Sequence, residues 1–317
     1  MHSKAARPVP SIEILDTPRE RPPRPFQIDK FTSIPFFLVH VAALSAIWVV
    51  VTTTDVIVCI ALYYLRMFGI TAGFHRYFSH RAYKTSRWFQ FVLAFIGGAS
   101  MQKGVLWWAA HHRNHHKFSD MPEDIHSPKQ DGFYWSHVGW ILSNQYDDTD
   151  WDRIRDFAKY PELRWLNRWH WVPALVGGAI LYAIGGIHFF VWGGLVSSVL
   201  LWHGTFFINS LAHVWGSRRY PTTDTSRNNF WLSLITMGEG WHNNHHFYQS
   251  TANQGFFWWE VDFSYYILKL LSWVGVVWDL RTPPHHILEG KSPAAEVAQA
   301  ASDAISATVP PAALPTA

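Results

Sequence analysis

The sequence predicts an all-α membrane protein with four transmembrane helices and a cytoplasmic helical cap that carries a histidine-rich metal site. Three observations favour this fold class. Of the 317 residues, 49% are apolar and 17% aromatic, but only 15% are charged, whereas a soluble domain usually has about a quarter. Long segments contain no charged residue, and many of the 19 histidines stand in groups. The net charge of +3, without a basic tract, argues against nucleic acid as a partner.

The two ends of the chain differ in composition from the rest. Residues 1–30 are rich in proline and arginine and lack the apolar stretch of a secretory signal, so we expect a flexible cytoplasmic arm. Residues 289–317 are rich in alanine, serine and proline, and we expect this tail to be disordered. One membrane-bound domain is therefore expected at residues 31–288.

Four apolar segments are candidates for transmembrane helices. The first, FFLVHVAALSAIWVVV, lies in the uncharged stretch between Lys30 and Asp55 and approaches the ~20 residues that cross a bilayer. The second extends from Val56 to Phe74 and is apolar except for Arg66, which must pair, snorkel or face a cavity. The 49 residues from Trp169 to Ser217 contain no Asp, Glu, Lys or Arg. They fit two crossings joined by a tight turn at a glycine pair, either 185–186 or 193–194.

Basic residues set the expected orientation. Lysine and arginine are frequent in the N-terminal arm and from Arg76 to Arg168, but absent from the turns after the first and third spans. The basic side is expected to be cytoplasmic. The 14 residues from Trp88 to Met101 are too few to cross and predict an interfacial or re-entrant helix. We therefore expect a multi-pass protein, of the bacterial inner membrane, whose histidine clusters face the cytoplasm.

Four histidine clusters are candidates for metal binding. Two have the pattern HxxHH, and residues three and four apart share a helix face, so each directs three imidazoles to one point. Their members are His112, His115 and His116, and His242, His245 and His246. His75 and His80 are five residues apart, which is off the α-helical repeat and fits a helix end. Asn209 and His213 again share a face.

The number and type of these side chains indicate the metal. Nine imidazoles exceed the ligands of one zinc site, so two metals are expected. The single cysteine, Cys59, excludes a CxxC site, and imidazole ligands with open positions suit oxygen-activating non-heme iron. One HxxHH pattern alone is as often a surface cluster, but several on one side of a membrane favour metal. The other histidines are interpreted as surface or hydrogen-bonded residues: His2, His40, His111, His126, His137, His170, His188, His203, His285 and His286.

Five motifs, in this order, resemble the membrane-bound acyl desaturases of the stearoyl, delta-9 type. They are GFHRYFSHRAYKTS, HHRNHHKFSD, DGFYWSHVGW, NSLAHVWG and GEGWHNNHHF, within a region from about Pro35 to Pro283. The resemblance implies a four-span fold with a cytoplasmic di-iron centre. It further implies O2-dependent insertion of a cis double bond, at delta-9, into a saturated C16 or C18 acyl thioester, with acyl-CoA as the expected carrier.

The resemblance also assigns residues and a partner. The metal ligands it implies are His75, His80, His112, His115, His116, His213, His242, His245 and His246, with Asn209 bound through a water. The family's tryptophan one turn before the second box corresponds to Trp108, which would line an acyl tunnel. Ala110 stands where the animal acyl-CoA members have a basic residue. A separate electron donor of ferredoxin, cytochrome b5 or reductase type is expected, because the sequence has no GxGxxG motif or cysteine cluster.

Spacings of four residues extend the expected tunnel. Thr205 precedes Asn209 and His213 on one face of the fourth span, which would connect the tunnel wall to the metal. Tyr63 and Met67 share a face with His75 in the second span. Met67 lies eight residues from His75, about 12 Å along a helix, so either side chain could form the tunnel floor.

Two other functions fit part of the pattern. A hydroxylase or ketolase of the same histidine-box superfamily would use similar ligands, but HRYFSH and HRNHHKFSD resemble the desaturases. A metal-transport protein would need ionisable residues inside its spans, whereas the clusters are expected outside the membrane. Metal analysis with oxygen consumption separates transport from oxidation.

Overall fold

A computed structural model gives the fold of the protein and describes residues 28–290. The expectations for the arm at 1–30 and the tail at 289–317 therefore fall almost entirely outside the described residues. Within them, the chain is mostly helical, with one two-stranded antiparallel sheet in which Lys84 pairs with Trp278. The longer helices are α1 (Ile34–Ala43), α2 (Thr53–Phe68), α3 (Arg87–Gly98), α4 (Val105–Phe118), α8 (Pro161–Arg168), α9 (Val172–Phe189), α10 (Ser197–Asn209) and α14 (Phe263–Trp273).

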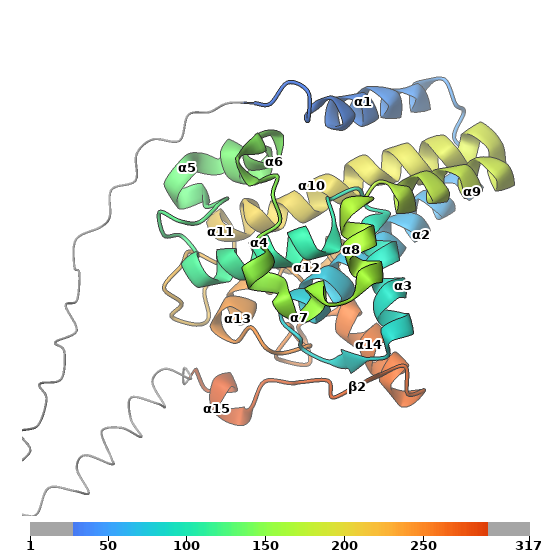
Figure 1. The fold of residues 1–317 in the computed structure, drawn as a ribbon. Coiled ribbons are helices and arrows are strands. Elements are labelled where there is room, and N and C mark those ends of the chain that lie inside the picture. Colours follow the sequence, from blue (N-terminus) through green and yellow to red (C-terminus); the bar gives the residue numbers. More distant parts are fainter. Residues whose placement is uncertain (1–27, 291–317) are drawn as a thin grey trace, which may run out of the picture.

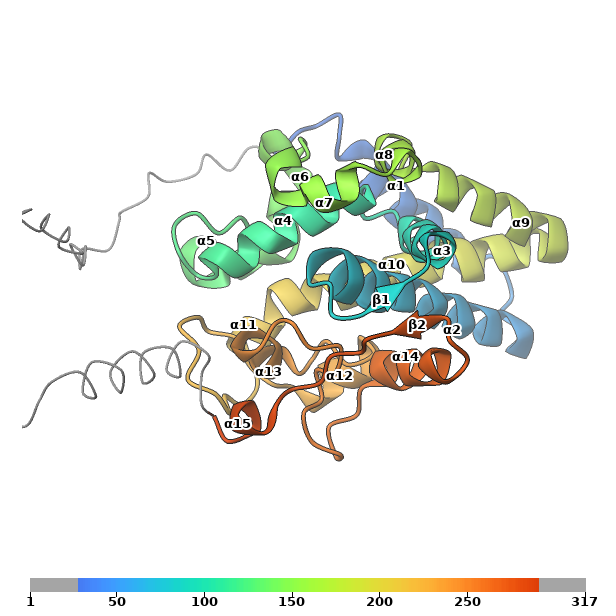
Figure 2. The same ribbon diagram turned by 60° about the horizontal axis from the view of Figure 1, so that its bottom comes forward.

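Shorter elements connect these helices. They are α5 (Pro128–Tyr134), α6 (Trp140–Leu142), α7 (Arg155–Ala158), α11 (Leu211–Val214), α12 (Phe230–Ile235), α13 (His242–Phe247), α15 (His285–Leu288), β1 (Lys84–Thr85) and β2 (Val277–Trp278). Three π-helical stretches are η2 (Gly69–Ser79), η3 (Trp135–Gly139) and η6 (Phe190–Val196). Three 3-10 turns are η1 (Leu44–Ile47), η4 (Asn144–Tyr146) and η5 (Trp151–Ile154). In both ribbon views α2, α9 and α10 lie alongside one another, and α11, α13 and α15 gather beyond one end of this bundle (Figures 1 and 2).

Two helical stretches are long and apolar enough to cross a membrane, Thr53–Ser79 and Val172–Val214. The second folds back on itself at the first glycine pair, where Gly186 has φ 59°, a left-handed conformation that glycine adopts without steric cost. The predicted turn is therefore confirmed at 185–186. The first apolar segment forms the shorter helix Ile34–Ile47. Length and composition thus support two candidate spans in the described chain, rather than the four that the sequence predicts.

The charge of Arg66 inside α2 is buried and hydrogen-bonded. Its guanidinium donates to the hydroxyls of Ser197 (2.5 Å) and Ser198 (2.7 Å) and to the backbone oxygen of Leu62 (3.1 Å). Of the alternatives left open by the sequence, pairing within the protein is the one realised. Because the hydroxyls belong to α10, this side chain joins α2 to α10.

The core holds η2 and α4 against each other. Phe74 and Phe78 of η2 pack with Leu93 of α3, Leu106 of α4 and Leu163 of α8, all fully buried. The segment predicted to be too short to cross is the helix α3, which packs on η2. The backbones of η2 and α3 are in close contact at this point, since a Cβ added at Gly69 would lie 2.5 Å from the backbone nitrogen of Gly97. The core therefore sets the positions of the two helices that carry the first two histidine clusters.

Candidate metal centre

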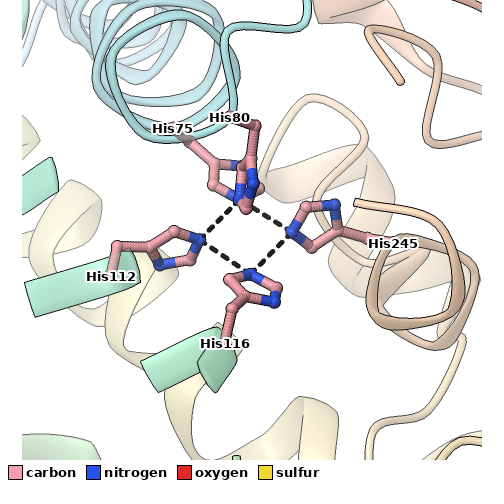
Figure 3. A group of neighbouring side chains, drawn as sticks. All are labelled: His75, His80, His112, His116 and His245. Atoms are coloured by element: carbon pink, nitrogen blue, oxygen red, sulfur yellow. Dashed lines mark hydrogen bonds between the residues drawn. The ribbon is translucent and has the colours of Figure 1, made fainter. Parts of the chain in front are cut away.

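The first group of ligands consists of five imidazoles that converge on one point (Figure 3). Its members are His75 and His80 at the end of η2, His112 and His116 of α4, and His245 of α13. One ligand nitrogen from each lies within 4.8 Å of all the others. The Nε2 atoms are 3.0 Å apart for His80 and His112, 2.9 Å for His112 and His116, and 2.9 Å for His116 and His245.

These separations match the geometry of a metal site. Ligands at right angles around an ion, each about 2.1 Å away, are separated by √2 times that distance, about 3.0 Å. An imidazole Nε2 carries either one proton or one lone pair, so the Nε2 atoms of His112 and His116, which each make two of these contacts, cannot satisfy both by hydrogen bonding. The donor set therefore fits a divalent metal at the common centre.

The second group has four members, all buried. They are His115 of α4, His213 of α11, and His242 and His246 of α13, with ligand atoms within 4.8 Å of one another. The Nε2 atoms of His242 and His213 are 3.1 Å apart. Nε2 of His246 is buried and has no hydrogen-bond partner among the described residues. A metal in this group would satisfy that nitrogen.

The two HxxHH motifs are each divided between the two groups. In α4, His112 and His116 belong to the first group and His115 to the second. In α13 the division is reversed, because His245 belongs to the first group while His242 and His246 belong to the second. The expectation that each motif serves one point is therefore wrong. Adjacent residues project about 100° apart on an α-helix, whereas residues four apart project about 40° apart.

A π-helix brings His75 and His80 together. By the α-helical repeat, their spacing of five predicts a helix end. In the structure, the backbone N–H of His80 donates to the carbonyl of His75 (3.2 Å), a bond across five residues that is typical of π-helical turns. The two rings are 4.8 Å apart between centroids. This wider turn gives the two imidazoles a common direction.

Acidic side chains hold the far nitrogens of several ligands. Glu239 lies 2.6 Å from Nδ1 of His75, Asp124 lies 3.0 Å from Nδ1 of His115, and Asp224 lies 2.7 Å from Nδ1 of His246. Asp120 accepts from the hydroxyl of Thr225 (2.6 Å), which lies 3.3 Å from Nδ1 of His213. These acidic residues are not among the site residues that the sequence predicts, although Asp120 and Glu239 lie inside the quoted motifs.

The electrostatics keep most of the imidazoles neutral, which is the form that binds metal. Burial lowers the pKa of His80, His112, His116, His242, His245 and His246. Burial also opposes a charge on His115, but the carboxylate of Asp124 outweighs it and raises the pKa of that imidazole. Burial alone would raise the pKa of Asp124 and Asp224, yet their histidine partners lower it, so both stay ionised.

A cavity of about 540 Å³ adjoins the first group, a size typical of a small-molecule site. Its walls are mainly apolar and aromatic, and they include the predicted residues Trp108 and Thr205 together with His112 and Asn209. The indole of Trp108 stacks on the imidazole of His112, with 4.9 Å between centroids. The hydroxyl of Thr205 accepts from the amide of Gln102 (3.0 Å). An apolar chain in this cavity would lie next to the imidazole of His112.

Two predicted tunnel residues do not line this cavity. Tyr63 and Met67 are buried against Gly204, and the Tyr63 hydroxyl donates to the carbonyl of Ile235 (2.9 Å). The spacing of four that aligned them with His75 does not persist, because the helix changes to π geometry at Gly69. Their role as the tunnel floor stays a prediction.

Other differences concern α10 and the remaining histidines. α10 ends at Asn209, and His213 belongs to α11, so the face that begins at Thr205 is interrupted at Ser210. Among histidines not assigned to metal, His111, His126 and His170 line the cavity. The ring of His126 lies 4.3 Å from that of His115. A single histidine without a repeated spacing carries no pattern from which a position in the cavity wall could be predicted.

Comparisons with known proteins agree on one family. The family profile named "Fatty acid desaturase" matches residues 46–269. An "Acyl-CoA C20 Delta5-desaturase" of Anemone leveillei is 37% identical over 71% of this chain and 73% of its own length. An "sn-2 palmitoyl-lipid 9-desaturase" of Nostoc sp. (strain 36) is 38% identical over 66% and 74%, and "Delta-9 acyl-lipid desaturase 1" of Arabidopsis thaliana is 38% identical over 71% and 75%. The chain belongs to the fatty acid desaturase family, and it is an oxidoreductase that acts on fatty acyl chains.

Proposed function

We propose that this desaturase uses two iron ions, one in each histidine group, with O2 as co-substrate, to introduce a cis double bond at delta-9 of a saturated C16 or C18 acyl chain. The observation that carries the proposal is the pair of imidazole groups beside an apolar cavity. Two of the relatives described above are named 9-desaturases and one a Delta5-desaturase, so the position of the double bond needs a direct test.

The residues proposed as iron ligands form two sets. The first set is His75, His80, His112, His116 and His245, and the second is His115, His213, His242 and His246, with Asn209 bound through a water. Imidazole ligands without thiolate suit iron. When bound, the iron with O2 supplies the removal of hydrogen from an unactivated methylene, which acid–base side chains cannot achieve.

The chain's own residues have the task of placing the substrate. The cavity walls hold the alkyl chain and exclude water, and Trp108 fixes the plane of the His112 imidazole by stacking on it. Glu239, Asp124 and Asp224 orient the imidazoles that they contact, so that the opposite nitrogen of each ring faces its group.

We also propose the membrane arrangement and partners implied by the sequence. Four helical segments, α1 with its extension, α2, α9 and α10, would cross the membrane, with both histidine groups on the cytoplasmic side of a bacterial inner membrane. The substrate would be an acyl thioester such as acyl-CoA, and a separate ferredoxin, cytochrome b5 or reductase would supply the electrons.

Expression in a host with a defined fatty acid composition tests the reaction. Mass spectrometry of the total fatty acids should reveal new C16:1 or C18:1 with a cis double bond at delta-9, absent from cells that express His112→Ala. A hydroxylated product without a double bond would assign the chain to the hydroxylase reaction. A double bond at another carbon would retain desaturation and refute the assigned position.

A further inference from the structure

Helix α1 forms one wall of the cavity. It lies at the outside of the molecule (Figure 1). Pro35, Phe36 and Val39 of α1 line the cavity. On the opposite side of the same helix, Leu38 and Val41 are 61% and 65% exposed, and no residue of α1 is buried. A single helix therefore separates the acyl cavity from the surroundings of the protein.

This wall packs on η6, and aromatic contacts and single hydrogen bonds hold it against α10 and α6. The ring of Phe36 stacks on Trp202 at 5.3 Å and on Phe206 at 6.5 Å between centroids. At the beginning of the helix, the hydroxyl of Ser33 donates to the carbonyl of Leu142 (3.1 Å), which also accepts from the backbone of Asp29 (2.8 Å). Stacked rings and single hydrogen bonds each contribute only about 1 kcal/mol.

Three histidines outside the metal groups form a second fastening, here named the histidine clasp (His40, His203 and His137). Nε2 of His40 lies 3.2 Å from Nε2 of His203, and Nδ1 of His203 lies 2.9 Å from Nε2 of His137. These side chains come from α1, α10 and η3 respectively. The clasp thus joins α1 to the two elements behind it.

The clasp has one consistent pattern of donors. Nδ1 of His40 lies 2.8 Å from the backbone carbonyl of Phe36, which can only accept, so this nitrogen carries the proton. Nε2 of the same neutral ring must then accept from His203, and the second nitrogen of His203 must accept from His137. Every contact of the clasp is satisfied while all three rings are neutral, which suits a site beside apolar surroundings.

We propose that α1 is a lateral gate through which an acyl chain, already dissolved in the cytoplasmic leaflet, enters the cavity between α1 and α10. The inference rests on the proposed function. The polar carrier stays at the membrane surface, and the histidine clasp closes the gate after entry. The exposed apolar face of α1 fits this role, because it lies against lipid hydrocarbon both before and after the helix moves.

A reversible cross-link across the gate tests this inference. His40→Cys and His203→Cys are combined in a Cys59→Ser background, and the full-length protein is reconstituted in lipid nanodiscs with iron and an electron donor. A short bis-methanethiosulfonate reagent links the two cysteines, and dithiothreitol releases them. We expect at least a tenfold lower rate of unsaturated product in the linked sample than in the same sample after reduction. Each single-cysteine variant, treated alike, should lack this recovery.

The source of the acyl chain is resolved by two arms, one with palmitoyl-CoA and one with dipalmitoyl phosphatidylcholine as the only saturated chains. In whichever arm yields product, the linked protein should be slower. Equal rates before and after reduction would refute the gate and assign entry to another opening. If the first pair prevents folding, Phe36→Cys with Trp202→Cys closes the same wall, and the same comparison applies.

A measurement without turnover separates the gate from the proposed reaction. A phospholipid with a diazirine near the middle of its acyl chain is photolysed in the nanodiscs, and labelled peptides are identified by mass spectrometry. Labelling of the segment that contains Trp108 is expected in the reduced protein and should be lost in the linked protein. Persistent labelling after linkage would refute the gate even if the enzyme proved inactive, whereas gated labelling without desaturation would refute only the proposed reaction.

Discussion

Replacing Asp224 by Asn should loosen the metal in the second histidine group and leave the first group intact. The carboxylate lies 2.7 Å from Nδ1 of His246 and is itself buried, with Ser226 donating to its other oxygen. It holds the proton on Nδ1 and leaves the Nε2 lone pair for the metal. Removing such a carboxylate behind a ligating histidine typically costs about 10- to 100-fold in metal affinity.

The assay is graded removal of metal from the purified full-length protein. Iron-loaded protein is dialysed against increasing concentrations of a chelator, and the iron retained per chain is measured by plasma mass spectrometry. In Asp224→Asn, one equivalent should leave at about 10- to 100-fold lower chelator concentration than in the wild type. The second equivalent should leave at the wild-type concentration. Glu239→Gln, which acts on His75 at 2.6 Å, should weaken the other equivalent instead.

A matched control is Asp279→Asn. This carboxylate pairs with Lys84 at 2.7 Å at the surface, with both side chains more than half exposed, and it belongs to neither histidine group. Metal retention in the control should equal that of the wild type. The reasoning is refuted if Asp224→Asn releases both equivalents together, or if neither acidic substitution changes retention.

Four further outcomes are expected. His112→Ala should abolish desaturation and lower bound metal, because it removes an imidazole from the first group; wild-type product with normal metal content would contradict the site. Asn209→Ala should reduce the rate less than His213→Ala, as a water-mediated contact loses about 10- to 100-fold, and equal complete loss would argue against the water. Burial and the neighbouring His203 lower the pKa of His137 to about 4, below the ~6.5 of an unfolded imidazole. The unfolded chain therefore takes up this proton first, and the unfolding free energy should fall from pH 6.5 to 4, a dependence that His137→Gln should flatten in thermal unfolding. Met67→Ala should shift the product from C16 towards C18 if Met67 is the tunnel floor, with unchanged chain lengths as the contrary result; at 1% exposure, it should also cost about 2–5 kcal/mol of stability.

The sequence sufficed for features that depend on composition and local spacing. The uncharged stretch around Gly185 and Gly186 predicted a reversal that the structure confirms at that pair. The isolated Arg66 predicts pairing, snorkelling or a cavity, and the structure realises pairing, with two serine hydroxyls. Each prediction rests on a local feature of the sequence. One is an apolar stretch too long for a single span, and the other is a charge inside an apolar segment. Neither requires knowledge of which distant residues pack nearby.

The assignment of histidines to two groups depends on tertiary structure instead. Residue spacing within α4 shows that the side chains of His112 and His116 share a direction. It does not show which other helix contributes histidines on that side. The position of α13 decides this, because His245 faces the first group and His246 the second. The π-helical turn at His75 was equally hidden, since it depends on packing of η2 against α3 and α4 rather than on local propensity.

The division of each motif has a consequence for the spacing of the two metal positions. α4 contributes His115 to one group and His116 to the other, so the distance between the groups depends on two adjacent residues of one helix. The same is true of His245 and His246 in α13. α4 contributes two histidines to the first group and one to the second, and α13 contributes one and two. A shift of either helix would therefore move ligands of both groups together. By contrast, His213 lies on the short α11 beyond the break at Ser210, and it contributes to one group only. Adjustment of one group without the other must therefore come through an element that serves a single group, which is α11 for the second group and the end of η2, with His75 and His80, for the first.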